Sequence, residues 1–188
     1  AAAKSRVNWQ QLKVSEQQVQ LAAPGMGITL NGLAQGYAVD LALAALRAKG
    51  IEHALLDTGE FGTIGSKAGG QAWVLGIKHP RQNNELSAKV PMDNRQLATS
   101  GDYETFFSSD FVHHHIFDPA SGDSPSTLAS VTVLAPTGMM ADGLSTAFMV
   151  MGADKALALA AQLPQVDALL IHKNGTVQTT DNFPTLAA

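Results

Sequence analysis

Short apolar stretches alternate along this chain with turns rich in glycine, proline and small polar residues, a pattern that predicts many short strands and a few helices. A strand begins at Ile28 and runs into a small-residue loop that ends at Gly36. Other apolar runs predict strands at 14–21, 53–57, 73–78, 90–92, 96–99, 111–117, 130–135, 166–171 and 176–180, the last two joined in a hairpin across 173–175. Helical spacing predicts helices over 37–49, 141–151 and 154–163. The expected fold class is therefore α+β, with a mixed β-sheet and helices packed on it.

Length and composition limit the kinds of protein that this can be. The 188 residues, 45% of them hydrophobic, suit one compact domain spanning 1–188, and a domain of this size buries about 70% of the surface of its unfolded chain. The net charge is −4 and there is no basic cluster, so we expect no nucleic-acid partner. The absence of cysteine excludes disulfides, thiolate metal sites and cysteine nucleophiles. No apolar run reaches the roughly 18 residues that a membrane span needs.

The segment 140–147 holds the first candidate site. Asp142 and Thr146 are four residues apart on a predicted helix, which places a carboxylate and a hydroxyl on one face. These are hard oxygen donors, and with no thiolate or imidazole in the same turn they suit Mg²⁺ or Ca²⁺. Another interpretation stays open, in which Asp142 caps the helix while Ser145 and Thr146 bond neighbouring carbonyl groups.

Three small-residue turns are also candidate sites. Across 28–37 a strand, a glycine-bearing turn and a helix N-terminus follow one another, and this order directs free backbone N–H groups at one point, where an anion would bind. The segment has neither a P-loop nor the dinucleotide-binding glycine pattern. The turn 58–62 contains Glu60, which either lines a pocket or is solvated, and we expect it to be solvated. The polar turn 100–103 lies at a strand end, where functional residues collect.

Three consecutive histidines, His113 to His115, suggest a zinc site at first sight. Side chains alternate along a strand, however, so only His113 and His115 would share a face, and no third ligand follows at a suitable spacing. A single inward histidine beside Asp118 is the better interpretation, because a neighbouring carboxylate fixes the tautomer of an imidazole and raises its basicity. A surface histidine that only solvates the strand remains the alternative.

Four separated blocks carry a family resemblance. They are Leu-Asn-Gly-Leu-Ala-Gln-Gly-Tyr-Ala-Val-Asp at 30–40, Leu-Ala-Thr-Ser-Gly-Asp-Tyr-Glu at 97–104, His-Ile-Phe-Asp-Pro at 115–119 with Gly122, and Ala-Asp-Gly-Leu-Ser-Thr at 141–146. In this order they resemble the ApbE family of FAD:protein FMN transferases, and the first block has the Leu-Asn-Gly-x-Ala-Gln-Gly form of a subset of that family. The resemblance runs from about residue 8 to residue 180 and includes Trp73 and the turn 78–81.

The resemblance implies an ApbE-like architecture, related to the T-fold, and a Mg²⁺-dependent enzyme. Such an enzyme cleaves the pyrophosphate of FAD, attaches FMN through its phosphate to a Ser or Thr hydroxyl of a target protein, and releases AMP. Family members typically work on the outer face of the bacterial inner membrane. The resemblance therefore implies a periplasmic location, an acceptor flavoprotein in a membrane redox complex, and membrane contact only through an anchor outside this sequence.

Carried over position by position, the resemblance also assigns site residues. Asp142, Thr146 and the backbone carbonyl at Gly32 would hold the metal. His115 matches the histidine proposed to help deprotonate the incoming hydroxyl, and together with Asp142 it makes up the expected catalytic residues. The positions that would bind FAD are Thr29, Gly32, Gln35, Ser100 and Phe117.

Three departures from the family pattern leave alternatives open. Many members have an acid and a lysine where this chain has Thr29 and Gln35, so a cation is missing from the flavin site, and Ser145 stands where some members have another acid. The chain also corresponds to about the C-terminal two thirds of the family's usual length, without the preceding region that forms one wall of the flavin pocket. The alternatives are a non-catalytic FAD- or FMN-binding or carrier module and a Mg²⁺-dependent FAD pyrophosphatase, in which water replaces the protein hydroxyl.

Overall fold

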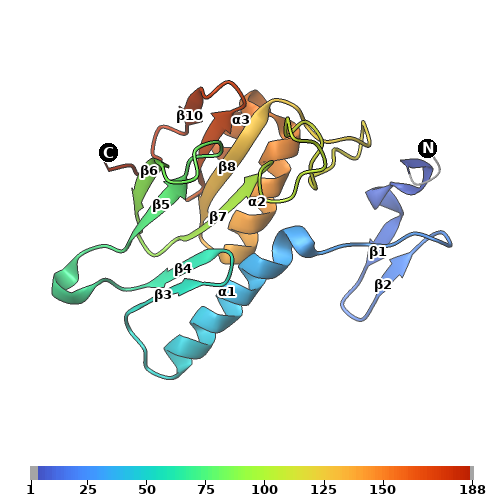
Figure 1. The fold of residues 1–188 in the computed structure, drawn as a ribbon. Coiled ribbons are helices and arrows are strands. Elements are labelled where there is room, and N and C mark those ends of the chain that lie inside the picture. The colour runs from blue at the N-terminus through green and yellow to red at the C-terminus, as the bar shows by residue number, and fades with distance from the viewer. Residues whose placement is uncertain (1–3, 187–188) are drawn as a thin grey trace.

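The computed structural model describes residues 4–186, and a six-stranded sheet forms its centre (Figure 1). The strands run in the order β10-β9-β8-β7-β4-β3, and each neighbouring pair is antiparallel. Every residue of the central strand β8 is buried, because helices cover one face of the sheet and a hairpin covers the other. The strands of this sheet are β3 (Ala54–Asp57), β4 (Phe61–Ile64), β7 (Gln96–Gly101), β8 (Leu128–Ala135), β9 (Asp167–His172) and β10 (Val177–Thr179).

Three helices pack on one face of this sheet: α1 (Asn31–Ala48), α2 (Gly138–Met151) and α3 (Ala153–Ala160). α2 contacts β7 and β8, α3 contacts β9, and α1 lies between α2 and the edge formed by β3 and β4 (Figure 1). The Thr137 side chain caps the start of α2 by accepting a hydrogen bond from the Met140 N–H, and Gly152 ends the helix in a conformation with positive φ.

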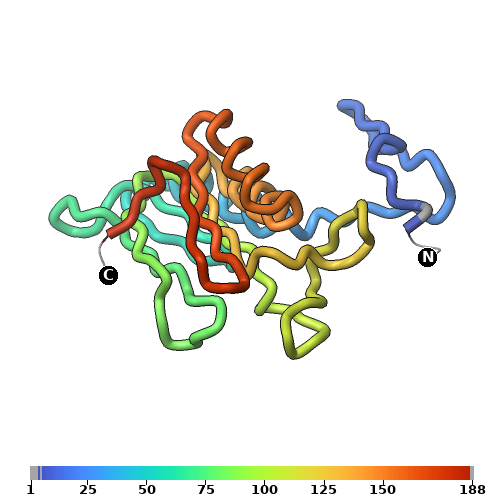
Figure 2. Tube along the Cα trace, turned by 90° about the horizontal axis from the view of Figure 1, so that it is seen from above, coloured from blue at the N-terminus to red at the C-terminus, as the bar shows by residue number. Residues whose placement is uncertain are grey.

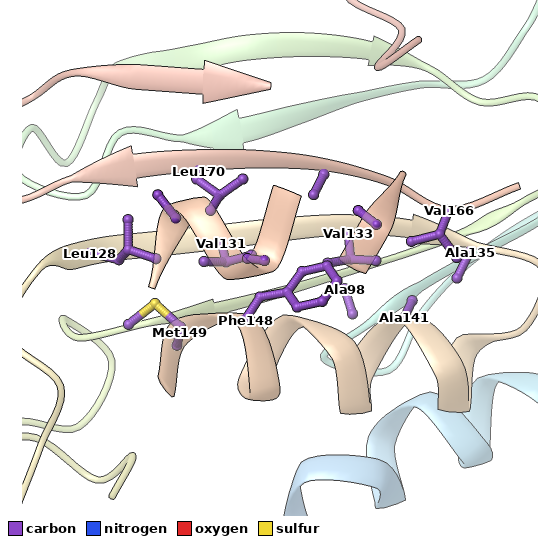
Figure 3. Packing of buried hydrophobic residues seen from close by; sticks show 14 of the residues in the cluster. Ala98, Leu128, Val131, Val133, Ala135, Ala141, Phe148, Met149, Val166 and Leu170 are labelled. Carbon is purple, nitrogen blue, oxygen red and sulfur yellow. The ribbon is translucent and has the colours of Figure 1, made fainter. Parts of the chain in front are cut away.

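Side chains on β8 alternate between two cores, as the period of a strand requires. Val131 and Val133 face the helices and pack with Phe148 and Met149 of α2 (Figure 3). Leu134 faces the other way, into a cluster covered by the hairpin of β5 (Val74–Lys78) and β6 (Leu86–Pro91). The sheet is thus held from both sides, which makes the C-terminal end of β7 a rigid support for the side chains that follow it.

The N-terminal segment lies away from the sheet (Figures 1 and 2). It holds the hairpin of β1 (Leu12–Val14) and β2 (Val19–Leu21), and a coil over 22–30 leads from it into α1. Lys4 contacts the long loop between β7 and β8, since its Nζ donates to the Ser121 carbonyl at 2.9 Å. Short 3-10 turns are present at Lys4–Arg6, Trp9–Gln11 and Ala68–Gly70.

The α+β prediction is confirmed, whereas several local predictions are wrong. Residues 28–30 form no strand, and the helix begins at Asn31 rather than at residue 37, so the expected small-residue loop is part of the first two turns of α1. The expected strand 14–21 is instead the hairpin of β1 and β2. Residues 61–64 pair as β4, and 111–117 form an irregular loop with the isolated bridge Phe106–His114.

Contacts with distant parts of the chain explain these differences. Gly36 lowers the intrinsic helix propensity of its segment, yet it is needed there because α2 passes too close for a side chain. In the 111–117 loop, the backbone N–H groups of His113 and His114 donate to the hydroxyls of Ser108 and Ser124 instead of to a neighbouring strand. Within residues 4–186 no helix combines the length and the apolar character needed to cross a membrane.

Candidate active site

Two glycines let α1 and α2 cross at very close range. A Cβ added to Gly36 would lie 2.1 Å from the Gly138 carbonyl oxygen, and a Cβ added to Gly138 would lie 2.5 Å from the Gly36 carbonyl oxygen. Asp40, one turn after Gly36, accepts hydrogen bonds from the Gly138 and Met139 N–H groups at 2.7 and 2.9 Å, which favours the N-terminus of α2. The crossing therefore fixes which side chains of the two helices meet.

Asp142 projects from α2 into this crossing. Its Oδ2 accepts a hydrogen bond from the Gly36 N–H at 2.9 Å, and the residue is 5% exposed. Burial raises the pKa of the Asp142 carboxyl, while hydrogen bonds from the backbone N–H groups of Gly36 and Gln35 oppose the rise. A buried carboxylate without a cationic side chain beside it gains stability when a metal ion supplies the missing positive charge.

Three hydroxyl groups gather one turn further along α2. Ser100, near the end of β7, places its Oγ 2.7 Å from Ser145 Oγ and 3.0 Å from Thr146 Oγ1. A Cβ added to Gly32 would lie 3.4 Å from Thr146 Oγ1, so the first turn of α1 also borders this group. The structure thus brings together Gly32, Ser100, Asp142 and Thr146, which come from α1, β7 and α2. The interpretation of Asp142 as a helix cap is wrong, because Thr137 caps α2, although Ser145 does donate to the Asp142 carbonyl at 2.9 Å.

The donor set at this point fits Mg²⁺. The Gly36 N–H donates to Asp142 Oδ2, which places the Asp142 carboxylate against α1, four residues after Gly32. The Gly32 carbonyl oxygen also lies 3.9 Å from the Cβ position of Gly143 on α2. Nowhere in the part of the chain that the structure describes do three His, Cys, Asp or Glu side chains form a metal-binding group. A metal here would use one carboxylate with hydroxyl and carbonyl oxygens, which are ligands that Mg²⁺ accepts.

Glu60 was expected to be solvated, and this expectation is wrong. The residue is 7% exposed, and its Oε2 accepts a hydrogen bond from the Thr99 N–H at 3.1 Å, one residue before Ser100. Burial raises the pKa of Glu60 to about 8, and the negative charges of Asp142 and Asp57 contribute to the rise. β4 and β7 pair only at Phe61 and Leu97, so the Thr99 N–H has no partner on β4 and donates to the Glu60 carboxyl instead. Nothing in the local sequence signals this contact, which depends on two strands that are far apart in the chain.

Replacing Glu60 by glutamine should change how stability depends on pH. The folded protein keeps the Glu60 proton up to about pH 8, whereas the unfolded chain loses it near pH 4.5, so wild-type stability falls as the pH rises through this window. The free energy of unfolding of Glu60→Gln relative to wild type should therefore increase by about 2–4 kcal/mol between pH 4.5 and pH 9. Urea denaturation at both pH values measures it, with the exposed Glu52→Gln as control. A constant difference between the two pH values would contradict the prediction.

His115 lies on the long loop between β7 and β8 and is exposed. Its Nδ1 is 3.1 Å from the Thr105 carbonyl oxygen, and because a carbonyl only accepts, this contact keeps the proton on Nδ1 and leaves Nε2 free to accept one. The expected pairing of a histidine with Asp118 is wrong. Asp118 instead accepts hydrogen bonds from the Ala120 and Ser121 N–H groups in a turn, because the loop is not a strand that could hold both residues at one edge.

The other two histidines of the triplet have different surroundings. His113 Nδ1 lies 2.9 Å from Asp123 Oδ1, and both side chains are more than half exposed. His114 is fully buried, its Nε2 lies 3.2 Å from the Pro125 carbonyl oxygen, and burial lowers its pKa. Both the zinc interpretation and the surface-histidine interpretation assumed a regular strand over these residues, and the structure has an irregular loop there.

The remaining residues predicted to contact FAD, Thr29, Gln35 and Phe117, are exposed on the surface. Thr29 Oγ1 accepts a hydrogen bond from the Asn31 N–H at 3.3 Å, at the start of α1. Gln35 is exposed, and its amide lies against Gly59, where a Cβ would be 2.1 Å from Gln35 Nε2. Phe117 is 54% exposed and stacks on Phe107 with ring centroids 6.3 Å apart. Among the described residues, no hydrogen bond joins His115 to Asp142 or Thr146. The loop of His115 and the group of Gly32, Ser100, Asp142 and Thr146 are therefore two separate parts of the candidate site.

Comparisons with known proteins place this geometry in a family. A profile described as the ApbE family matches residues 1–170. The chain is 36% identical over 174 residues to the FAD:protein FMN transferase of Treponema pallidum, which covers 86% of this chain and 48% of that protein. It is 33% identical over 169 residues to the FAD:protein FMN transferase of Vibrio cholerae, covering 88% of this chain and 49% of that protein. The chain therefore spans about half the length of these curated relatives.

Solved structures agree with the sequence comparison. The ApbE protein of Thermotoga maritima superposes with a TM-score of 0.86 at 29% identity, over 96% of this chain and 60% of that chain. The apo form of the flavinyl transferase ApbE of Pseudomonas stutzeri gives a TM-score of 0.77 at 34% identity, over 96% of this chain and 56% of that chain. Sequence profile and fold lead to the same conclusion: the chain belongs to the ApbE family.

Proposed function

We propose that this chain is part of a Mg²⁺-dependent enzyme that transfers FMN from FAD to a Ser or Thr hydroxyl of an acceptor protein and releases AMP. The observation that carries the proposal is the group of Gly32, Ser100, Asp142 and Thr146, which puts hard oxygen donors beside the N-terminal turn of α1. A metal ion and a pyrophosphate can bind together at such a place. The names of the Treponema and Vibrio relatives, FAD:protein FMN transferase, support the same reaction.

In this proposal Asp142, Thr146 and the Gly32 carbonyl would hold Mg²⁺, which supplies positive charge against the pyrophosphate oxygens. The N-terminus of α1 adds the partial positive charge of its helix dipole, and Gly32 has no side chain to obstruct the phosphates. Phe117 would lie against the nucleotide, as an exposed aromatic ring on the neighbouring loop.

His115 would accept the proton of the acceptor hydroxyl on Nε2. The hydroxyl oxygen forms a bond to the FMN phosphorus, the bond from that phosphorus to the bridging oxygen of the pyrophosphate breaks, and AMP leaves with the electron pair. The contact between Nδ1 and the Thr105 carbonyl keeps the imidazole in the tautomer that this step requires. Ser100 would hold Thr146 in place through the 3.0 Å contact between their hydroxyls.

One incubation separates this function from its two alternatives. The protein is mixed with FAD, Mg²⁺ and a candidate acceptor polypeptide; AMP is quantified by chromatography and the acceptor by mass spectrometry. Flavin-labelled acceptor together with AMP supports the transferase. AMP without label would replace it by a FAD pyrophosphatase, and FAD binding with neither product would replace it by a binding or carrier module. Omission of Mg²⁺ with a chelator is the control and should prevent both products.

A lysine at position 35 is expected to strengthen FAD binding. Gln35 is exposed at the second turn of α1, beside the proposed phosphate position, and the chain lacks a cation there. Gln35→Lys should lower the dissociation constant of FAD about fivefold, which corresponds to roughly 1 kcal/mol for a partly exposed ion pair. Gln35→Met is the matched control of similar length. Equal affinities of the two variants, measured by flavin fluorescence, would place the phosphates away from residue 35.

We also propose a periplasmic location and an acceptor flavoprotein in a membrane redox complex. Both rest on what membership of the ApbE family implies. Fractionation of the producing bacterium, with the protein followed by antibody, tests the location. Recovery of the protein with the cytoplasmic fraction would contradict it.

A further inference from the structure

Asp102 directly follows β7, and its fully buried carboxylate pairs with two cationic side chains. The Arg81 guanidinium donates to both carboxylate oxygens, at 2.7 and 2.8 Å, and Lys173 Nζ lies 3.4 Å from Oδ2. Arg81 comes from the turn between β5 and β6, and Lys173 from the turn between β9 and β10. The Asp102 cluster, made of these three residues, therefore joins three separate hairpin ends through charge-assisted hydrogen bonds.

The Asp102 cluster also holds the loop 102–127, which contains no helix or regular strand. Lys173 Nζ donates to the Phe111 carbonyl at 2.7 Å, and the Lys173 backbone N–H donates to the Thr127 carbonyl at 3.1 Å. The Arg81 guanidinium lies 4.3 Å from the centre of the Phe111 ring. Phe111 has a φ of 60°, a conformation that non-glycine residues adopt only when their surroundings impose it. Both cations thus act on the same residue of the loop.

Phe111 is linked to His115 by two backbone hydrogen bonds between the segments 105–107 and 113–115. The Phe107 N–H donates to the His113 carbonyl at 2.7 Å, and the His115 N–H donates to the Thr105 carbonyl at 3.0 Å. These two bonds align 105–107 against 113–115, and Phe111 lies in the turn that connects them. A shift of the turn therefore changes the direction of the His115 imidazole.

We propose that Lys173 is a positioning residue of flavin transfer, which, fixed by Asp102, holds the Phe111 main chain and with it the loop that carries His115. The inference rests on the proposed function, in which His115 receives the proton of the acceptor hydroxyl. Lys173 is far along the chain from every residue assigned to the metal or FAD, and its side chain is 19% exposed. Its expected effect is on the chemical step and not on the binding of the metal, whereas Phe117, which stacks on Phe107 of the same loop, can shift with His115.

Lys173→Met is the variant that isolates this role. It removes the hydrogen bond to the Phe111 carbonyl while Arg81 still neutralises Asp102, so no buried charge is left unpaired. Lys173→Arg keeps a cation of similar reach, and Lys155→Met, at an exposed position on α3, is the matched control. We expect kcat for transfer to fall about 10- to 100-fold in Lys173→Met, as for a misplaced catalytic group. The Mn²⁺ dissociation constant should stay within about twofold of wild type, and Lys173→Arg should recover most of the rate.

Amide hydrogen exchange tests, without an activity assay, whether Lys173 holds the loop that carries His115. The Phe107 and His115 amides should exchange about tenfold faster in Lys173→Met than in wild type, while the amides of β8 remain unchanged. If these two amides exchange in Lys173→Met as slowly as in wild type, the proposal is overturned. It is also overturned if Lys173→Met loses metal affinity and the protection of the β8 amides together with the rate, because that result indicates a general structural role. If the wild-type protein labels no acceptor, the proposed function fails, and the exchange rates alone still decide whether Lys173 holds the loop.

Discussion

Asp142→Asn is expected to reduce flavin transfer by at least about 10³-fold, because a neutral amide cannot supply the negative charge that holds a divalent cation. Asparagine has the shape of aspartate and keeps an oxygen for the Gly36 N–H, so the crossing of α1 and α2 should remain intact. Alanine would be a poorer choice, since it leaves the buried Gly36 N–H without its acceptor at a cost of about 1–3 kcal/mol. The thermal transition of Asp142→Asn without metal should therefore be equal to or above that of wild type, because the buried charge has been removed.

Two measurements check this prediction. Mn²⁺ binding, followed by electron paramagnetic resonance, should be lost in Asp142→Asn and kept in the exposed control Asp181→Asn. The rate of AMP release should fall with it. Full activity of Asp142→Asn would place the metal elsewhere, and Mn²⁺ bound at the His113–His115 segment would identify that place.

Local spacing was enough to predict one part of the candidate site. Asp142 and Thr146 are four residues apart on a helix, and any helix over this segment puts them on one face, wherever the helix lies in the fold. The same reasoning could not place Ser100 beside them, because that contact depends on how β7 and α2 pack. The family resemblance, and not the pattern of apolar residues, indicated that Gly32, Ser100 and Asp142 belong to one site.

The wrong predictions concern positions where distant contacts outweigh the local pattern. Glu60 looks like a solvated turn residue in the sequence, and only the divergence of β4 from β7 turns its carboxyl onto the Thr99 amide. Residues 31–36 look like a loop because glycine is a poor helix former, but the close passage of α2 requires Gly36 and stabilises the helix through Asp142. The 111–117 segment has the apolar content of a strand, yet Lys173 and hydroxyl groups satisfy its backbone instead of a neighbouring strand.

His115→Ala should lower kcat for flavin transfer by about 10²–10⁴-fold, the usual contribution of a positioned acid–base group. FAD affinity should change little, because the ring is exposed and its Nδ1 contacts only the Thr105 carbonyl of its own loop. Stability should change little for the same reason, in contrast to replacement of the fully buried His114. His113→Ala is the matched control, since His113 is also exposed and pairs with Asp123 at the surface.

The pH dependence of the rate distinguishes a base from a residue that only shapes the loop. In wild type, an imidazole that already carries a proton on Nε2 cannot accept the proton of the hydroxyl, so the rate should fall in acid. His115→Ala should lose this limb and retain the remaining rate across the pH range, whereas His113→Ala should keep the wild-type profile. A wild-type rate and profile in His115→Ala would remove His115 from the mechanism, and the activation of the acceptor hydroxyl would then fall to the metal that Asp142 and Thr146 are proposed to hold.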